Sequence, residues 1–381
     1  MYILSQGLNR MRSTDKILVV GAAIARTLAE AGYGIRVIDK RGHIGGNAFD
    51  NINEHGERIH RYGPHLMHGH PNGKAVRWLS QYTEWIEYEH RVRALLADGR
   101  TTPLPVNRTT LEDIFGCALQ NDHAAEQLLA EIRSEITEPT NTDEFFLANV
   151  GEQLADLFFR PYTLKMWGRP ANELAASIGA RLPVRTNRDD RYFTDGFQAL
   201  PKEGYTALFN GILNHPNIDV QLGHPYEAGM EKDFLHSFLS VAIDNYFDYA
   251  FGELPYRSVI FHTSRSRHDQ AAPVINFTDT GRFTRSTQWD LLPNSSKAPD
   301  GMHSQTIEEP CSIKDNPGEY YYPVQTESSK AQMKQYQSEA HKVANITFIG
   351  RTGLFRYIDM LPAVTMHLDL AEAFLKDQGP A

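Results

Sequence analysis

The feature that most constrains the fold of this chain lies near its N-terminus, where a strand pattern, a helix pattern and a second strand pattern follow one another. Lys16–Val20 (KILVV) and Ile35–Ile38 are short apolar runs, which is typical of buried parallel strands. Between them, Ile24 and Leu28 lie four residues apart, as they would on one face of a helix. This order predicts a βαβ unit, and therefore a parallel sheet of the Rossmann type.

The rest of the chain indicates further units. With 381 residues it exceeds the roughly 250–300 residues of a large single core. A helical pattern begins near Thr109, whose spacing from Glu112 fits a capping box. From about Ser258 to Pro323, short runs such as VINF predict strands joined by polar turns. Ile346–Ile349 predicts another buried strand before a final helix, so we expect the chain to leave the first domain and return to it.

Composition excludes several classes of protein. The net charge is −9 and there is no long basic run, which argues against a nucleic-acid scaffold. Cys117 and Cys311 alone make neither a disulfide framework nor a zinc site, which fits a reducing compartment. No apolar run approaches the roughly 18 residues that span a bilayer. We therefore expect a cytoplasmic protein with no nucleic-acid or membrane partner. Because the chain carries net negative charge, it must concentrate its arginines at one place if it binds an anion.

The turn after the first strand lacks most of the glycines of a dinucleotide-binding loop. Such loops use glycine to bring backbone N–H groups close to pyrophosphate at a helix N-terminus. Here the turn from Gly21 to Arg26 holds one glycine, and its spacing to Asp39 is short. We interpret Gly21, Asp39, Gly45 and Gly46 as remnants of a cofactor-binding set that has lost its cradle. A divergent but working loop is the alternative.

Six segments follow one another in the order in which a known family carries them. They are KRGHIGGNAFD, RYGPHLMH, FFRPYTLKMWG, ARLPVRTNRDDRYFTDGFQALPKEGY, IDNYFDYAFGELPYRS and GRTGLFRYIDM. Together they resemble the UDP-galactopyranose mutase family from Lys16 to the last helix. The resemblance implies an α/β fold in which a Rossmann-like FAD/NAD(P)-type domain carries an inserted helical domain and an antiparallel β-sheet domain.

The expected domains follow from this resemblance. The Rossmann-like domain should comprise residues 1–82, 200–243 and 328–381, the helical domain residues 108–180, and the antiparallel substrate domain residues 83–107, 181–199 and 244–327. The family's members are often dimers through the helical domain, which makes a homodimer one option for this chain and leaves its oligomeric state open. In that family, reduced flavin attacks the anomeric carbon of a nucleotide sugar through N5. The diphosphate leaves, the sugar ring opens and recloses on another oxygen, and the diphosphate returns.

The resemblance also implies a set of site residues. Expected catalytic residues are Arg185, Arg285, His68 and Tyr357, and expected substrate-binding residues are Phe158, Tyr162, Trp167, Tyr192, Tyr322, Arg351 and Asp359. The two arginines would hold the diphosphate, because a guanidinium fork matches phosphate oxygens. Phe158 and Tyr162 lie four apart in a presumed helix and would sandwich the base. Surface ion pairs and core packing are the alternative roles when these residues are considered one at a time.

The departures from the family pattern lie on the cofactor side. Besides the lost glycines, Ser240-Val241-Ala242 stands where relatives have a Gly-Pro turn, and Leu361-Pro362 replaces a polar residue at the flavin edge. We therefore expect a mutase of a UDP- or GDP-linked hexose that works without flavin, by stabilising the departing diphosphate. An ordinary FAD-dependent enzyme and a non-catalytic sugar-nucleotide binding protein remain alternatives.

Three histidines, His65, His68 and His70, form an H-x-x-H-x-H pattern in a loop. His68 and His70 are candidates for binding a divalent metal, Mg²⁺ or Mn²⁺, that would assist the diphosphate, and hydrogen-bonded loop histidines are the alternative. His90 is a further candidate for the pocket. The base, the hexose, the general acid or base and the oligomeric state stay open at this stage.

Overall fold

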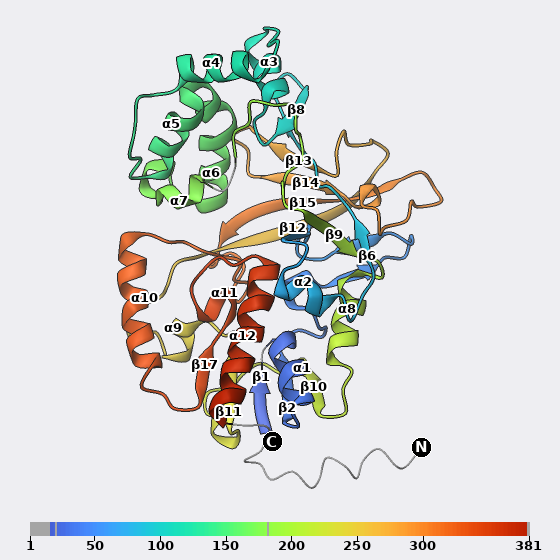
Figure 1. Cartoon of the computed structure of the whole chain (residues 1–381), viewed down its shortest axis with the longest axis vertical. Helices are drawn as coiled ribbons and strands as arrows, with labels where there is room; N and C mark the ends of the chain where they lie inside the picture. The colour runs from blue at the N-terminus through green and yellow to red at the C-terminus, as the bar shows by residue number, and fades with distance from the viewer. Residues whose placement is uncertain (1–15, 20, 181–182, 379–381) are drawn as a thin grey trace.

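The structure is a computed structural model that describes residues 16–19, 21–180 and 183–378. Val20, at the end of the first predicted strand, lies outside the described residues. The lower half of the molecule in Figure 1 is built on a five-stranded parallel sheet in the order β10-β2-β1-β11-β17. The strands are β1 (Lys16–Val19), β2 (Gly34–Asp39), β10 (Ile218–Leu222), β11 (His236–Leu239) and β17 (Ile346–Phe348). The predicted Rossmann-like fold is confirmed.

Burial explains why this sheet forms. Ile17, Leu18 and Val19 are at most 1% exposed, so β1 is apolar toward both faces of the sheet, as a central parallel strand requires. Ile24 and Leu28, the predicted helix stripe, are fully buried. The helices of this half are α1 (Ala22–Glu30), α2 (Lys74–Leu79), α8 (Gly204–Leu213), α9 (Ile243–Tyr246), α10 (Glu327–Ala340), α11 (Gly350–Gly353) and α12 (Met360–Gln378).

The helical domain forms the top of the molecule in Figure 1. It contains α3 (Arg108–Phe115), α4 (Asp122–Ile132), α5 (Thr142–Leu154), a π-helical turn (Ala155–Phe159), α6 (Arg160–Trp167) and α7 (Ala176–Gly179). The predicted capping box between Thr109 and Glu112 is wrong, because the box is formed by Asn107 and Thr110. Asn107 Oδ1 accepts from the Thr110 backbone N–H at 3.1 Å, and Asn is at least as good an N-cap as Thr.

A seven-stranded sheet joins the two halves in the order β16-β12-β15-β14-β13-β7-β8. Its strands are β7 (Val92–Leu95), β8 (Thr101–Leu104), β12 (Tyr256–Ser266), β13 (Val274–Phe277), β14 (Arg285–Gln288), β15 (His303–Ser312) and β16 (Tyr322–Pro323). The expected antiparallel sheet is mixed, because β13 pairs with β7 in parallel. The reason is that β7 enters from a distant part of the chain, and no hairpin fixes its direction.

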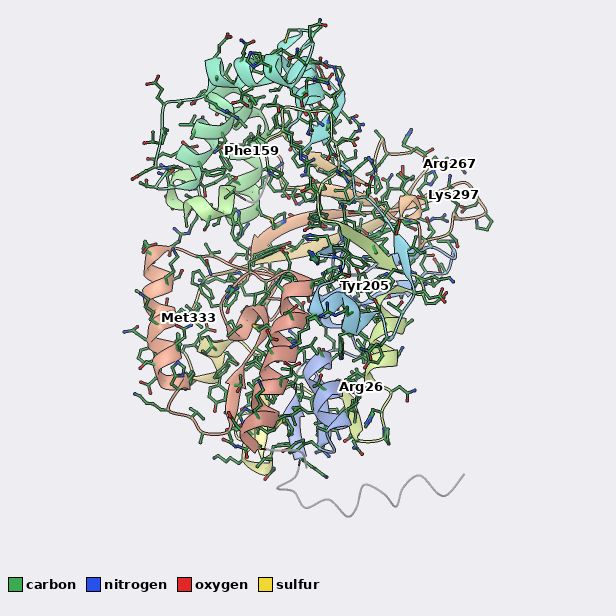
Figure 2. All side chains as sticks on the ribbon, viewed as in Figure 1. Arg26, Phe159, Tyr205, Arg267, Lys297 and Met333 are labelled. Carbon is green, nitrogen blue, oxygen red and sulfur yellow. The ribbon has the colours of Figure 1, made fainter. Side chains whose placement is uncertain are left out.

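Two smaller sheets complete the middle layer. One has the order β5-β9-β6 (Met67–Gly69, Phe197–Pro201, Trp85–Glu87), and the other pairs β3 (Asp50–Ile52) with β4 (Arg58–His60). Figure 2 shows Phe159 within the helical domain and Tyr205 and Met333 in the lower half, and each belongs to a different hydrophobic cluster. The interior therefore consists of several hydrophobic clusters, and the domains meet between them. Over the described ranges, the helices are all too short or too polar to cross a membrane.

Candidate active site

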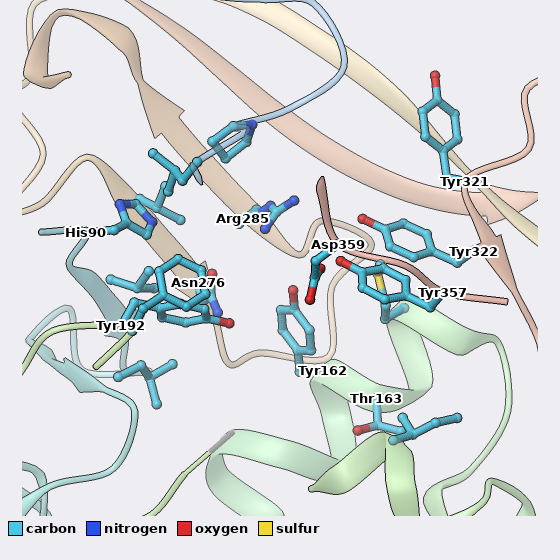
Figure 3. A pocket seen from close by; sticks show the side chains of 18 of the residues that line it. His90, Tyr162, Thr163, Tyr192, Asn276, Arg285, Tyr321, Tyr322, Tyr357 and Asp359 are labelled. Atoms are coloured by element: carbon cyan, nitrogen blue, oxygen red, sulfur yellow. The ribbon is translucent and has the colours of Figure 1, made fainter. Parts of the chain in front are cut away.

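A cavity of about 500 Å³ lies at the junction of the helical domain, the seven-stranded sheet and the start of α12. Five polar side chains from different elements converge on it in Figure 3: Tyr162 from α6, Arg285 from β14, Tyr322 from β16, and Tyr357 and Asp359 from the segment before α12. Their convergence brings together residues that are nearly 200 positions apart in the sequence. This is the arrangement expected of a binding site between domains.

Arg285 is held by a buried carboxylate. Its Nε lies 2.8 Å from Oε1 of Glu308, whose side chain is 3% exposed, and the two residues face each other across β14 and β15. Burial by itself would lower the pKa of Arg285, but Glu308 together with Tyr162 and Tyr322 outweighs this effect and raises it. Arg285 therefore stays cationic, with its guanidinium fixed in orientation at the cavity wall.

Aromatic rings form the wall beside Arg285. The rings of Tyr322 and Tyr357 are parallel, with centroids 5.9 Å apart, and Trp167 meets Tyr322 edge-on at 6.1 Å. The guanidinium of Arg351 lies 4.2 Å from the centroid of the Tyr357 ring, and its Nε donates to the Ile358 carbonyl at 2.9 Å. Burial raises the pKa of Tyr322 to about 12, so its hydroxyl remains a hydrogen-bond donor at neutral pH.

Aromatic and aliphatic side chains form a further part of the cavity wall, which we call the slot. Phe158 and Tyr162 both line it, as predicted for the base-binding pair. Phe158 lies in the π-helical turn and not in a regular α-helix, because Pro161 at the start of α6 has no N–H to continue the usual ladder. Apolar residues close the slot: Val92, Leu104, Phe146, Ile178 and Val274. A flat ring fits such a lining by stacking and dispersion.

Buried neutral histidines stand beside the slot. His90 is 4% exposed, and burial together with the nearby Arg285 lowers its pKa to about 3. Burial likewise lowers the pKa of His65 to about 3, and its Nδ1 lies 2.8 Å from the Gly63 carbonyl oxygen. Tyr192 packs edge-on against His90 at 5.8 Å. These rings shape the wall as uncharged groups at neutral pH.

Arg185, the second predicted diphosphate ligand, does not line the cavity in this conformation. Its Nη1 donates to the carbonyls of Asp189, at 3.0 Å, and Arg191, and its backbone N–H donates to Val106 at 2.9 Å. Its Nη2 is buried and has no hydrogen-bond partner among residues 16–19, 21–180 and 183–378. Burial lowers the pKa of this guanidinium. The loop that carries Arg185 thus provides acceptors for only some of the N–H donors of this buried guanidinium.

The predicted metal ligands His68 and His70 both line a second cavity, and each has a hydrogen-bonding partner of its own. His68 stacks on Phe193 with centroids 3.6 Å apart, and its Nδ1 lies 3.0 Å from Oδ2 of Asp195. His70 Nδ1 accepts from the backbone N–H of Asn72 at 3.1 Å, and His70 lines a second cavity next to the first. In the described part of the chain no three His, Cys, Asp or Glu side chains form a set that could hold a metal ion. The metal site at His68 and His70 stays a prediction, and the described side chains add no third protein ligand to it.

The remnant cofactor residues Gly21, Asp39, Gly45 and Gly46 are not among the described residues that line this cavity, although Asn47, which follows Gly46, does line it. α1 begins directly after Gly21, without a side-chain cap. A Cβ placed on Gly21 would lie 3.1 Å from Cδ1 of Ile349 and 3.7 Å from Cε1 of His367, so side chains of the last strand and helix crowd this helix start. Arg26, where a third glycine would stand, points its Nη1 to the carbonyls of α8 and Asn214.

The other remnants are used locally. Asp39 Oδ1 accepts from the Arg41 backbone N–H at 2.9 Å. Gly45 and Gly46 have φ of +85° and +53°, a backbone conformation that favours glycine at this turn. Leu361, which replaces a polar residue, is 7% exposed and packs in a hydrophobic cluster. With one glycine and a crowded helix start, the residues at the β1–α1 turn do not fit the diphosphate of a bound FAD.

Several residues of the site were missed from the sequence. Glu308 fixes Arg285, Asn276 lines the slot end of the cavity, and Asn47, Tyr62 and Tyr321 line its lower wall. Asn47 follows the glycine pair in the KRGHIGGNAFD segment, which was a usable signal. Glu308 had none, because only strand register places it opposite Arg285.

Comparison with known proteins follows this geometry. A model of the family described as UDP-galactopyranose mutase matches residues 157–357, more than half of the chain. The chain belongs to the UDP-galactopyranose mutase family. A model described as an NAD(P)-binding Rossmann-like domain matches residues 19–82, in agreement with the parallel sheet. The predicted family is thereby confirmed, and with it the assignment of the chain to the isomerases.

Curated relatives of this family member match along nearly its whole length. It is 35% identical to a probable UDP-galactopyranose mutase of Klebsiella pneumoniae, over 95% of both chains. It is 34% identical to a dTDP-fucopyranose mutase of Escherichia coli, over 95% of this chain and 99% of the relative. A crystal structure of reduced UDP-galactopyranose mutase superposes with a TM-score of 0.73 at 19% identity, covering 96% of this chain and 94% of that one, which shows the fold alone.

Proposed function

We propose that this chain interconverts the pyranose and furanose forms of a nucleoside-diphosphate hexose, and that it does so without bound FAD. The observation that carries the proposal is the mixed lining of the cavity. Aromatic and aliphatic residues, Phe158 among them, line it together with a polar wall that includes Arg285, Tyr322 and Tyr357. A nucleotide sugar needs both surfaces, because its base stacks on aromatic rings and its diphosphate pairs with cationic and hydroxyl donors.

The polar wall suits a leaving diphosphate. Breaking the bond between the anomeric carbon and phosphate places negative charge on the diphosphate, and preorganised donors aimed at that charge stabilise the transition state. Arg285 supplies a fixed cation, since Glu308 anchors its Nε and leaves its terminal nitrogens for a ligand. The hydroxyls of Tyr322 and Tyr357 add donors without adding charge. The same contacts hold the diphosphate in place for its return to the sugar.

Arg185 would complete this wall by a change of loop conformation. The guanidinium of Arg185 donates to two carbonyls and leaves Nη2 without a hydrogen-bond partner among the described residues. A charged diphosphate would be a stronger partner for this cation than the two neutral carbonyls. We infer that nucleotide binding draws the segment that carries Arg185 toward the cavity. This movement would close the site and exclude water from the separated sugar and diphosphate.

The proposal of flavin independence rests on the β1–α1 turn. The resemblance to the family implies reduced flavin as the nucleophile, yet the crowded start of α1 at Gly21 offers no diphosphate cradle. In the absence of a nucleophile on the anomeric carbon, stabilisation of the leaving diphosphate becomes the main requirement, and Arg285 and the tyrosines meet it. An FAD-dependent reaction, as the family implies, is the competing function.

The experiment is a panel of UDP-, dTDP- and GDP-linked hexopyranoses, each incubated with purified protein in EDTA and followed by NMR. The names of the relatives make UDP-galactose and dTDP-fucose the first substrates to try. We expect furanose anomeric signals to appear with at least one of them. A matched Arg285→Met variant should lose turnover by roughly two to three orders of magnitude, as removal of one oxyanion contact does. Binding of these nucleotides without any furanose product would contradict the proposal.

A further inference from the structure

The exchange of a six-membered for a five-membered sugar ring requires a proton to move between two sugar oxygens. In the direction from pyranose to furanose, the 4-hydroxyl loses its proton as O4 bonds to C1. The ring oxygen O5 gains a proton as its bond to C1 breaks. This requirement rests on the proposed mutase function. It applies whether or not another group is bonded to C1 during the exchange. The cavity must therefore contain a group that takes one proton and returns it.

Asp359 is the residue whose chemistry fits this task. Of the described residues that line the cavity, it alone carries a carboxyl group. Figure 3 shows the carboxyl end of Asp359 in the middle of the cavity, among Arg285, Tyr162 and Tyr357. Its own carbonyl accepts from the backbone N–H of Ala363 at 2.9 Å, which anchors the residue at the start of α12.

The tyrosines of the cavity are poor proton acceptors. Burial raises the pKa of Tyr162 well above its ordinary value and that of Tyr322 to about 12. Their hydroxyls therefore keep their protons at neutral pH and act as donors. The guanidinium groups of Arg285 and Arg351 likewise have no proton-accepting site. These groups position charge and cannot exchange a proton with the sugar.

The histidines of the cavity are unsuited for a different reason. Burial lowers the pKa of His65 and of His90 to about 3, so neither ring can hold a second proton while the sugar rearranges. His68 is committed to Asp195 through Nδ1 and stacks on Phe193. Asp359 is left as the group that can be both acceptor and donor within the same cavity.

We propose that Asp359 is the general base and then the general acid of ring exchange. As O4 attacks C1 and the C1–O bond to the diphosphate breaks, the Asp359 carboxylate takes the proton of the 4-hydroxyl. When the diphosphate oxygen returns to C1 and the C1–O5 bond breaks, the protonated carboxyl gives that proton to O5. No proton, electron or other reactant is left over, and the reverse reaction uses the same steps with O4 and O5 exchanged.

The test separates cleavage of the anomeric bond from ring exchange. The first assay follows scrambling of ¹⁸O from the bridging position of the sugar diphosphate, which reports breaking and re-forming of that bond. The second follows furanose formation by NMR, and the third measures UDP binding by calorimetry. For Asp359→Asn we expect UDP affinity within about threefold of wild type and ring exchange lowered by roughly 10²–10⁴-fold. Scrambling should be lowered by a much smaller factor.

Rescue distinguishes proton transfer from a structural role. Formate added to Asp359→Ala should restore a measurable part of ring exchange, and Asp359→Glu should retain more of it than Asp359→Asn. Asp369→Asn is the matched control, because Asp369 is a carboxylate on α12, the helix that follows Asp359, and pairs with Lys74 outside this cavity; it should behave as wild type. Equal losses of scrambling and ring exchange in Asp359→Asn, or no rescue by formate, would overturn the assignment.

The two proposals fail in different ways. Absence of furanose product from the wild-type protein, with every nucleotide sugar and with reduced FAD added, refutes the proposed function itself. A wild-type protein that forms furanose and an Asp359→Asn variant that forms it at the same rate refute only the role of Asp359. Turnover that appears only with reduced FAD refutes flavin independence, and the Asp359 variants are then compared under that condition.

Discussion

Substitution of Glu308 by glutamine should reveal how the cavity holds its fixed cation. The change keeps the size of the side chain and removes the charge that lies 2.8 Å from Nε of Arg285. Removal of one partner of a buried ion pair costs about 3–5 kcal/mol, because the other charge remains buried. The Arg285 side chain is 26% exposed toward the cavity, so water compensates part of that charge and we expect about 3 kcal/mol.

Urea unfolding followed by tryptophan fluorescence measures this loss, with and without UDP. UDP brings negative charge to Arg285, so it should stabilise Glu308→Gln more than it stabilises the wild-type protein. The matched control is the double variant Arg285→Met with Glu308→Leu, which removes both charges and should cost less than Glu308→Gln alone. If Glu308→Gln unfolds at the same urea concentration as wild type, and UDP stabilises both equally, the ion pair does not hold Arg285 as argued.

Three further predictions concern the slot, Arg185 and the stability of the fold at acid pH. Phe158→Ala should weaken UDP binding in calorimetry by about 1–3 kcal/mol, the usual value of a lost base stack, whereas Phe158→Tyr should bind nearly as wild type. Arg185→Ala should raise KM and lower kcat, and it should also lower the urea midpoint, because the buried side chain now donates to two carbonyls. Burial lowers the pKa values of His60 and His90 to about 3 in the folded protein, so below about pH 6.5 the unfolded chain binds more protons than the folded one. Stability should therefore fall as pH drops below 6.5, by roughly 1.4 kcal/mol per unit for each histidine, and His90→Asn should show a shallower fall in urea midpoints.

Much of this fold was accessible from local sequence patterns. The alternation of apolar runs and one amphipathic stretch between Lys16 and Asp39 predicts the βαβ unit, because burial on both faces of a parallel strand needs such runs. The order of six segments identifies the family without any long-range information. Tyr162, Tyr322 and Tyr357 could be assigned to one site because each lies in one of those segments or in a tyrosine cluster near them.

The remaining features depend on contacts that the sequence does not encode locally. Glu308 meets Arg285 only through the register of two strands, and a slip of one residue would place Glu309 there instead. Arg185 lies outside the cavity because two nearby carbonyls accept from it, which a motif cannot show. The capping box formed at Asn107 and not at Thr109 because two adequate caps compete within one turn, and tertiary packing decides between them.

The central claim is that this cavity carries out mutase chemistry without FAD. The most direct measurement is the rate of furanose formation by protein whose absorbance spectrum shows no flavin, compared with the rate after addition of reduced FAD. We expect turnover in the flavin-free protein and no increase on addition, because the start of α1 keeps one glycine and no side-chain cap to hold the cofactor's diphosphate. A preparation that is yellow with about one FAD per chain, or one that is active only with reduced FAD, would contradict it.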